Sequence, residues 1–300
     1  MMNNIKNVFT IKDLENLSGI KAHTIRIWEK RYNILEPLRT DTNIRYYDVA
    51  NLQKILNIST LNSFGYKISN LAKIPDDKIP QLVKEVLSKK SLANHVINNF
   101  KLAMMNFDRQ LFLSTYDSLL KEKSFRQIFH EYFIPLLEEI GTLWQTETIT
   151  PAHEHFISYL IKQKVASETE RLAVKENNDG RTYVLYLPEG EIHELGLMFL
   201  NYEFLLKGYN VIYLGESLPA ENIRNLKNYF NNITFISYIT VAPEMKAVND
   251  YIEGLNQQIL NDDATKLLLF GRNTQFIHPK NLGSNITIYA SIKDFAETIS

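Results

Sequence analysis

The chain has 300 residues, of which 45% are hydrophobic, and its formal net charge at pH 7 is −1. This length is enough for two or three globular units, because a single core usually stops growing at about 250–300 residues. No segment approaches the roughly 20 apolar residues of a membrane helix, and the N-terminus lacks the apolar core of a signal peptide. We therefore expect a soluble, cytoplasmic protein. The absence of cysteine excludes disulfides, thiolate metal sites and cysteine nucleophiles.

Charge is distributed unevenly along the chain. Residues 1–74 carry eleven Lys and Arg against six Asp and Glu, a balance of +5, whereas the remainder carries 22 against 28, or −6. This split indicates a basic arm for a polyanion and an acidic body. Basic surface alone is weak evidence, since many solvated helices are basic.

The first 55 residues show a helix-turn-helix pattern followed by a wing. Residues 10–18, TIKDLENLS, open with the capping residue Thr10 and carry apolar residues at helical spacing, after which Gly19 ends the helix. A second helix is expected from about Lys21 to Arg31. The polar turn at residues 40–43 and the extended segment at 44–47 predict a hairpin or wing, and another helix begins at Asp48.

The rest of the chain divides into a helical part and an α/β part. From about Pro75 to Asn177, apolar residues recur every three or four positions, which predicts a helical bundle of the four-helix type. Residues 176–180, ENNDG, read as a linker. Five short apolar β-type runs then alternate with helical segments, namely TYVLYL (182–187), NVIYLG (210–215), ITFISYI (233–239), KLLLFG (266–271) and NITIYA (285–290). This alternation predicts a Rossmann-like parallel sheet with helices on both faces. We expect domains at residues 1–75, 76–175 and 181–300.

Residues 10–55, TIKDLENLSGIKAHTIRIWEKRYNILEPLRTDTNIRYYDVANLQKI, resemble the MerR family of transcriptional regulators in both the helix-turn-helix and the wing. The resemblance implies binding to double-stranded operator DNA as a homo-oligomer, because such a small domain buries little DNA surface alone. The side chains implied to reach bases or phosphates are Lys21, His23, Thr24, Arg26, Arg39, Thr40, Asn43, Arg45 and Tyr46. Ile25, Trp28 and Tyr32 are expected in the domain core. A helix-turn-helix that serves only protein contacts is the alternative.

The segment GTLWQTETITPAHEH places Glu154 and His155 after Trp144 with nine residues between. By themselves these residues are a core aromatic and a helix start. The spacing resembles the W-x9-E-H signature of light-responsive, cobalamin-dependent MerR regulators. The resemblance implies that the three side chains cover the upper face of the corrin and its adenosyl group. Some members carry a histidine directly after the tryptophan, where this chain has Gln145.

The first β-run is followed by EGEIHELGL, in which Glu191, His193 and Gly196 resemble the D-x-H-x-x-G loop of cobalamin-binding folds, with Glu in place of Asp. The resemblance implies that His193 is the lower axial ligand of cobalt. A neutral imidazole nitrogen is a good ligand, and a carboxylate on the other ring nitrogen sets the tautomer. The glycine is implied to let a helix start close to the corrin ring.

Ser237-Tyr238-Ile239 resembles the S-x-L segment of the same folds, and Gly271 ends the fourth strand. In the family these sites make room for the nucleotide tail of cobalamin. The second glycine expected near Gly271 is absent, and Phe270 and Arg272 flank the one that is present. Either side chain narrows the tail channel, whereas an arginine is also able to pair with the tail phosphate.

Together these patterns predict a non-enzymatic DNA-binding repressor whose oligomeric state, dimer or tetramer, and DNA affinity respond to adenosylcobalamin and light. The alternative is a cobalamin-independent MerR-type regulator whose C-terminal domain serves oligomerisation or binds a protein partner. A cobalamin-dependent mutase or methyltransferase is disfavoured, because no residues remain for a substrate-binding barrel or a methyl-donor domain.

Overall fold

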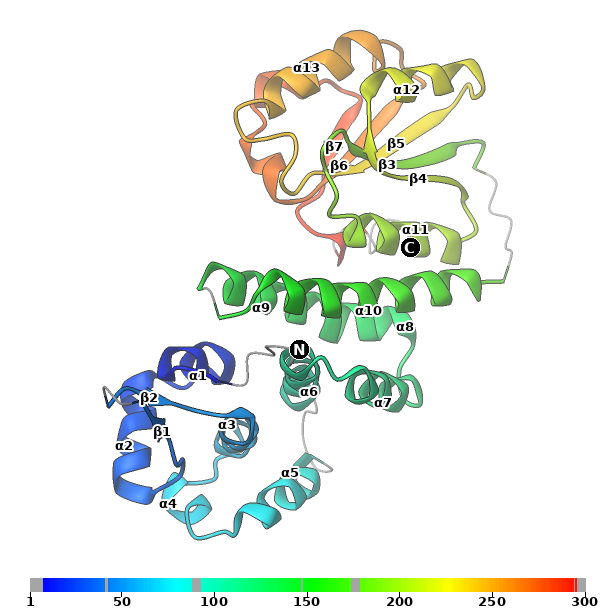
Figure 1. The fold of residues 1–300 in the computed structure, drawn as a ribbon. Helices are drawn as coiled ribbons and strands as arrows, with labels where there is room; N and C mark the ends of the chain where they lie inside the picture. Colours follow the sequence, from blue (N-terminus) through cyan, green and yellow to red (C-terminus); the bar gives the residue numbers. More distant parts are fainter. Residues whose placement is uncertain are drawn as a thin grey trace, which may run out of the picture. The chain divides into compact units, whose positions relative to one another are not determined.

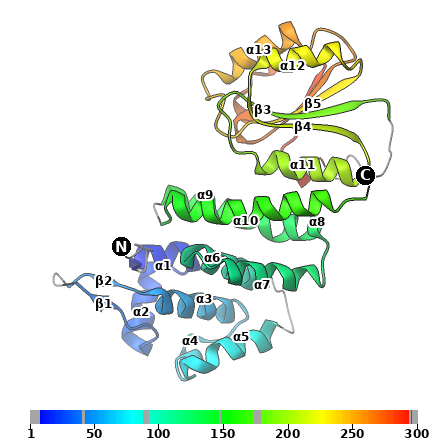
Figure 2. The same ribbon diagram turned by 45° about the vertical axis from the view of Figure 1, so that its right-hand side comes forward.

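The computed structural model describes residues 8–40, 43–87, 93–146, 148–173, 179–293 and 295. The chain forms two compact units, Met1–Leu160 and Ile161–Ser300 (Figures 1 and 2). Residues 176–178 of the predicted linker lie outside the described residues. Within the described ranges, no helix has the length and apolar character needed to cross a membrane.

The first unit begins with the predicted winged helix-turn-helix. Its elements are α1 (Ile11–Ser18), α2 (Ala22–Tyr32), β1 (Leu38–Arg39), β2 (Arg45–Tyr46) and α3 (Val49–Ser63). Thr10 caps α1 through a capping box with Asp13, and Gly19 ends the helix in the left-handed region at φ 74°. The strands pair antiparallel, and Phe9 bridges to Tyr47 beside them. These features confirm the predicted order of helix, turn, helix and wing.

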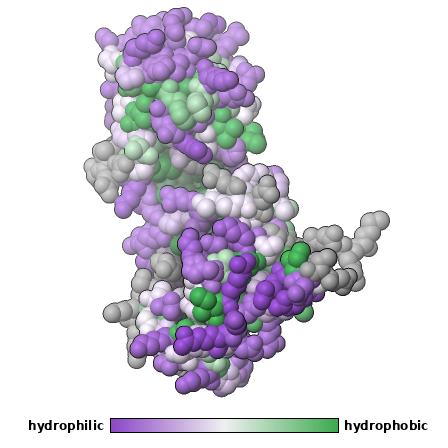
Figure 3. Space-filling view, turned by 90° about the vertical axis from the view of Figure 1, so that its left-hand side faces the viewer, coloured by the Kyte–Doolittle hydropathy of each residue, from purple (hydrophilic) through white to green (hydrophobic). Residues whose placement is uncertain are grey.

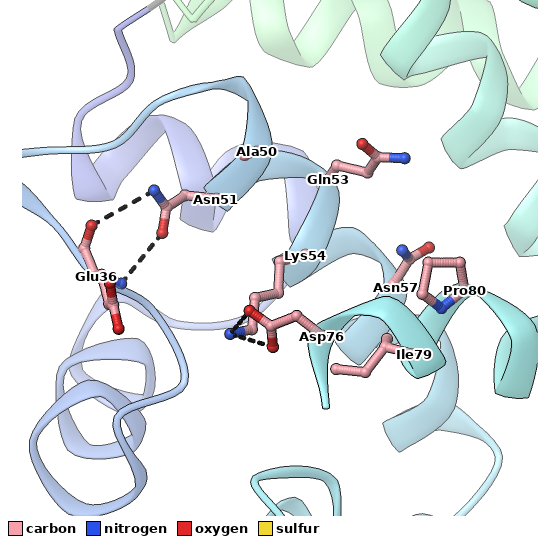
Figure 4. A pocket seen from close by; sticks show the side chains of 9 residues that line it. All are labelled: Glu36, Ala50, Asn51, Gln53, Lys54, Asn57, Asp76, Ile79 and Pro80. Carbon is pink, nitrogen blue, oxygen red and sulfur yellow. Dashed lines mark hydrogen bonds and ion pairs between the residues drawn. The ribbon is translucent and has the colours of Figure 1, made fainter. Parts of the chain in front are cut away.

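Three short elements follow α3: α4 (Ile68–Leu71), the 3₁₀ turn η1 (Asp76–Lys78) and α5 (Ile79–Leu87), which packs on α3. A polar cavity of about 350 Å³ lies between α3 and the start of α5 (Figure 4). Lys54 closes one side of it through an ion pair of 2.7 Å with Asp76. Asn51 joins the same helix to the backbone of Glu36 at 3.2 Å.

The core of the winged helix contains Ile25, which is 1% exposed, together with Leu14 and Leu17 of α1. This confirms the expectation for Ile25. Trp28 and Tyr32 are only half-buried, so the expectation that they lie in the core holds in part.

The helical bundle comprises α6 (Ala93–Asn106), α7 (Arg109–Leu120), α8 (Phe125–Ile128), the π-helical turn η2 (Phe129–Phe133), α9 (Ile134–Gln145) and α10 (Pro151–Glu170). Its core is aromatic: the ring of Phe100 lies 5.1 Å from Phe112 and 5.5 Å from Phe133. Because α8, η2 and α9 follow one another without a break, they count as one helix. With α6, α7 and α10 this gives four helices, as predicted. The π-turn was not predicted, because such turns are rare and short within α-helices.

A buried lysine connects the bundle to the winged helix within the first unit. Lys101 of α6 is 6% exposed, and its Nζ donates to the carbonyl oxygen of Leu17 at 3.0 Å and to Glu139 of α9 at 2.7 Å. Leu17 lies in the last turn of α1, where carbonyls lack helical partners and a cation is favourable. Nearby, the Asn16 amide donates to the Thr148 hydroxyl at 2.8 Å. Side chains of α6, α9 and the following loop therefore hold the end of α1.

The second unit contains a five-stranded parallel sheet in the order β4-β3-β5-β6-β7. Its strands are β3 (Thr182–Pro188), β4 (Asn210–Leu218), β5 (Ile233–Tyr238), β6 (Lys266–Phe270) and β7 (Ile286–Ile288). All five predicted runs form strands, which confirms the Rossmann-like α/β fold. The order reverses between β3 and β5, and ligands of such sheets bind at the carboxyl ends of the strands beside this point.

Helices cover both faces of the sheet. One face carries α11 (Leu195–Leu206), and the other carries α12 (Ala220–Asn225) and α13 (Val248–Gln258) (Figures 1 and 2). The remaining elements are the 3₁₀ turns η3 (Leu226–Asn228), η4 (Arg272–Phe276) and η5 (Pro279–Asn281). Fully buried Phe235 and Leu269 belong to the cluster that packs against α13.

We predict that Lys101→Met destabilises the first unit by about 1–3 kcal/mol, because the Leu17 carbonyl loses a buried donor and Glu139 loses its ion pair. Both tryptophans, Trp28 and Trp144, lie in this unit, so urea unfolding followed by tryptophan fluorescence measures the effect.

Lys121→Met, which removes an exposed lysine from the end of α7, is the matched control and should leave the midpoint almost unchanged. Equal losses in the two variants would show that the contact to α1 adds no stability.

Candidate functional site

The predicted DNA-contacting side chains lie on α2, on its N-cap or in the wing. Those that are exposed are Lys21, His23, Arg26, Arg39, Thr40, Asn43 and Arg45, and those that are half-buried are Thr24 and Tyr46. The surface around α2 and the wing is largely hydrophilic in Figure 3, with scattered hydrophobic side chains. The structure thus presents this set to solvent on the helix and hairpin named by the sequence.

Glu29 of α2 ties the second helix to the wing. One carboxylate oxygen accepts from Arg45 Nε at 2.8 Å, and the other accepts from the Tyr47 hydroxyl at 2.9 Å. The hydrogen bond and the charge of Glu29 raise the pKa of Arg45. In the wing, Arg39 donates to Asn43 Oδ1 at 2.7 Å, and Asn43 adopts a left-handed conformation at φ 64°. The sequence analysis missed Glu29, although its signal is visible: it is the one acidic residue in α2.

The residues predicted above the corrin lie at a helix-helix junction of the bundle. Trp144, 48% exposed, is near the end of α9, and Glu154 and His155 lie in the first two turns of α10. His155 Nε2 is 3.4 Å from Glu154, which also accepts a hydrogen bond from Ser158 at 2.9 Å. The side chain of Gln145 lies outside the described residues. His153 is buried and stacks on Phe107.

At the carboxyl end of β3, the carboxylate of Glu191 is completely buried and joins two loops. One oxygen accepts from the backbone N–H groups of Ile192 and His193, both at 3.0 Å, and lies 2.6 Å from His193 Nδ1. The other oxygen accepts from three consecutive backbone N–H groups of the loop after β5, at Thr240, Val241 and Ala242, at 2.6–3.0 Å. Glu191 therefore connects the loops on the two sides of the switch point.

This environment keeps Glu191 ionised. Burial raises the pKa of its carboxyl group, but backbone hydrogen bonds from Val241, His193 and Ala242 outweigh burial and lower the pKa to about 2. An ionised carboxylate accepts hydrogen bonds only, so His193 Nδ1 donates to it, and the neutral form of the ring has its lone pair on Nε2. The His193 side chain is 52% exposed. A half-exposed imidazole held in one tautomer suits an axial metal ligand.

Exposed hydrophobic side chains lie on the same two loops as His193 and its partner N–H groups. Ile192 is 60% exposed, Val241 55% and Met245 56%. The strands run towards the left in Figure 1, and Figure 3, viewed from that side, shows hydrophobic surface (green) on this face of the α/β unit. An exposed apolar surface of this kind usually marks a binding site. A flat macrocycle that already coordinates its own metal needs only one further ligand and apolar contacts from the protein. One imidazole nitrogen and exposed hydrophobic side chains on the same loops meet both requirements.

The other predicted cofactor residues of this unit make close contacts with the protein itself. A Cβ on Gly196 would lie 2.8 Å from the ring of Tyr238, and one on Gly271, at φ 97°, would lie 2.4 Å from the carbonyl oxygen of Ile239. Ser237 is completely buried beside the Tyr186 hydroxyl.

Asn273, which the sequence analysis missed, donates to the carbonyl oxygens of Val241 and Pro243 at 3.2 and 3.1 Å. It therefore fixes the loop that Glu191 binds. The partners of Asn273 and Glu191 are backbone carbonyl and N–H groups. Almost every residue has such groups, so no sequence motif marks them.

Comparison with protein families identifies the winged helix and the helical bundle. Residues 9–78 match the MerR HTH family regulatory protein model, and residues 96–167 match the B12 binding domain model. The chain joins a MerR-type regulatory domain to a B12-binding domain. The second match spans the helical bundle from α6 to α10. The two matches agree with the predicted MerR-type and cobalamin-binding character of this regulator.

Named relatives agree with this identification. The regulator is 26% identical over 224 residues to the HTH-type transcriptional repressor CarH of Myxococcus xanthus, covering 73% of this chain and 74% of that protein. It is 25% identical over 212 residues to the repressor CarA of the same organism, covering 70% and 69%. Both are transcriptional repressors by name, which agrees with the prediction of a non-enzymatic regulator.

Among solved structures, the monomethylamine corrinoid protein of Methanosarcina barkeri superimposes with a TM-score of 0.56. The match covers 68% of this chain and 96% of that one, at 14% identity. At this identity the likeness shows the fold alone, and it agrees with the predicted Rossmann-like α/β fold.

We predict that Glu191→Gln destabilises the α/β unit by about 2–3 kcal/mol at neutral pH, since a neutral amide replaces a charged acceptor of buried N–H groups. The pKa of Glu191 falls from 4.5 to about 2 on folding. Its stabilising contribution is therefore complete above pH 4.5 and is lost as the pH falls towards 2. Calorimetric unfolding across this range should show a smaller acid dependence in the variant.

Glu189→Gln alters an exposed carboxylate two residues earlier in the same loop and is the control. An acid dependence that is the same in Glu191→Gln and the unaltered protein would contradict the assignment.

Proposed function

We propose that this chain is a DNA-binding transcriptional repressor whose oligomeric state and operator affinity are controlled by adenosylcobalamin and light. The observation that carries the proposal is the imidazole of His193: Glu191 holds its Nδ1, and its side chain is half-exposed at the switch point of the sheet. His193 would be the cobalt ligand in this proposal, and Trp144, Glu154 and His155 of the bundle are proposed as further residues for the cofactor. Because operator DNA is the target, we propose the cytoplasm as its compartment.

The DNA-binding half of the proposal is supported by the exposed basic side chains of α2 and the wing. Lys21, Arg26 and Arg39 supply charges for phosphates, and the N-terminal turns of α2 supply side chains for base edges. One winged helix contacts a short half-site, so a dimer or tetramer with two such domains is expected on the operator.

Control by light requires a chemical event at the cofactor. Adenosylcobalamin supplies a cobalt–carbon bond that visible light breaks. Cleavage of this bond changes the oligomeric state of the protein only if the intact ligand favours one oligomeric state. The binding free energies to the two states must then differ by several kcal/mol.

The cofactor test is an absorbance spectrum of the purified protein with adenosylcobalamin, before and after green light. We expect a bound-state spectrum that changes on illumination together with the oligomeric state measured by chromatography. His193→Ala should lose the spectral signature of the axial imidazole, whereas His278→Ala, an exposed histidine on another loop, should keep it.

Absence of binding at micromolar adenosylcobalamin would contradict the proposal. It would favour the cobalamin-independent regulator, in which the C-terminal domain serves oligomerisation or a protein partner.

The DNA half is tested by fluorescence anisotropy with operator DNA over a range of salt concentrations. Removing one phosphate contact with Arg26→Ala should weaken binding and reduce the slope of log affinity against log salt by about 1. Arg224→Ala removes an exposed arginine of the α/β unit and should change neither quantity. Identical salt slopes for Arg26→Ala and the unaltered protein would exclude Arg26 from the DNA interface.

A further inference from the structure

We propose that the α/β unit selects a corrinoid that lacks the lower nucleotide base, a cobinamide-type ligand, over complete cobalamin. This inference rests on the proposed function, because it concerns the same His193 site. It follows from how side chains fill the carboxyl edge of the sheet around that histidine.

The chemistry of the ligand sets the requirement. In cobalamin a benzimidazole nucleotide hangs from the lower face of the corrin and is able to bind cobalt itself. When a protein histidine binds cobalt from below, the base is displaced towards the protein and needs a cavity for a bicyclic aromatic ring. Cobinamide has the same corrin and cobalt without this base, so it needs the imidazole and the apolar contacts but no such cavity.

Aromatic rings occupy the sheet face beneath α11 at the ends of three adjacent strands. The ring of Phe270 lies parallel to that of Tyr238, with centroids 6.2 Å apart, and nearly parallel to that of Tyr289 at 5.3 Å. Phe295 packs edge-on against Phe270 at 5.2 Å and Tyr289 at 4.8 Å. Phe270 and Phe295 are each 1% exposed. This aromatic cluster, Tyr238, Phe270, Tyr289 and Phe295, lies at the ends of β5–β7, and Phe295 also stacks on Phe204 of α11 at 5.2 Å.

The glycine at the start of α11 leaves no gap beside the cluster. The ring of Tyr238 lies so close to the backbone of Gly196 that a Cβ there would approach it to 2.8 Å. The missing side chain of Gly196 therefore accommodates a tyrosine of the protein rather than a ligand.

The glycine after β6 is explained by the protein in the same way. The backbone of Gly271 approaches that of Ile239, and Ile239 N donates to the carbonyl oxygen of Phe270 at 2.8 Å. Gly271 is required for this close approach of two chain segments, and Phe270 fills the place beside it.

The opposite sheet face is filled as well. Ser237 pairs with Tyr186 in the β3–β5 register, and the Tyr186 hydroxyl lies 3.0 Å from that of Tyr251 on α13. Burial raises the pKa of Tyr186 to about 12, although the hydrogen bond with Tyr251 acts in the opposite direction. Both faces of the sheet at this edge thus carry packed aromatic side chains.

The experiment titrates the purified full-length protein with aquocyanocobinamide and, separately, with hydroxocobalamin, and follows the absorbance spectrum. We expect cobinamide to bind about tenfold more tightly or better, because inserting the base must displace side chains from a packed interior. Both ligands bring cobalt to His193, so His193→Ala should remove the imidazole-dependent band with either one.

Phe270→Ala opens the cluster and should raise cobalamin affinity by about tenfold while changing cobinamide affinity little. Phe235→Ala truncates an equally buried ring on the other face and is the matched control. Tyr238→Ala, which alters a half-buried ring, provides a second test if Phe270→Ala does not fold, and the comparison of ligands on the unaltered protein needs no variant.

Cobalamin binding as tightly as cobinamide to the unaltered protein overturns the selectivity and leaves the proposed function standing. Binding of neither corrinoid overturns both. The inference is supported if the unaltered protein prefers cobinamide and if Phe270→Ala or Tyr238→Ala abolishes this preference.

Discussion

The structure of the cofactor edge depends on one buried carboxylate. Glu191 accepts five backbone N–H groups from the loops that follow β3 and β5 and also holds His193 Nδ1. Without the negative charge these donors would be buried without an adequate acceptor, and the two loops would lose their common anchor. The tautomer of His193, and with it any axial ligand role, is thus determined by the same interaction that shapes the edge of the sheet.

Much of this architecture follows from local signals in the sequence. The strands of the α/β unit are short apolar runs with flanking turns, and α1 begins after Thr10 and ends at Gly19. Local residue patterns are therefore enough to predict these strands and this helix. The site is less predictable, because its partners are distant in sequence and of unremarkable type. Three N–H groups from Thr240 to Ala242 carry no residue signature, and the contact of Tyr238 with Gly196 appears only when β5 and α11 are adjacent.

Within the first unit, the interface between the bundle and the winged helix contains polar contacts. Lys101 joins α6 and α9 to the last turn of α1, which leads through Gly19 directly into α2. Trp144 lies near the end of the same α9 that carries Glu139. A shift of α9 would therefore alter the ion pair of Lys101, whose buried ammonium also binds the Leu17 carbonyl oxygen of the helix-turn-helix.

The two departures from the family pattern at the cofactor edge fit together physically. The longer side chain of Glu191 reaches the amides of the β5 loop and still lies 2.6 Å from His193 Nδ1, so replacing Asp by Glu preserves the orientation of the imidazole. Phe270, in contrast, adds volume where a second glycine would leave space, and Tyr238 and Tyr289 pack against it. Glu191 in place of Asp keeps the imidazole oriented as a cobalt ligand requires. Phe270 in place of a second glycine fills the space that a nucleotide tail requires. An edge with both properties matches a corrinoid that is recognised through its ring and metal.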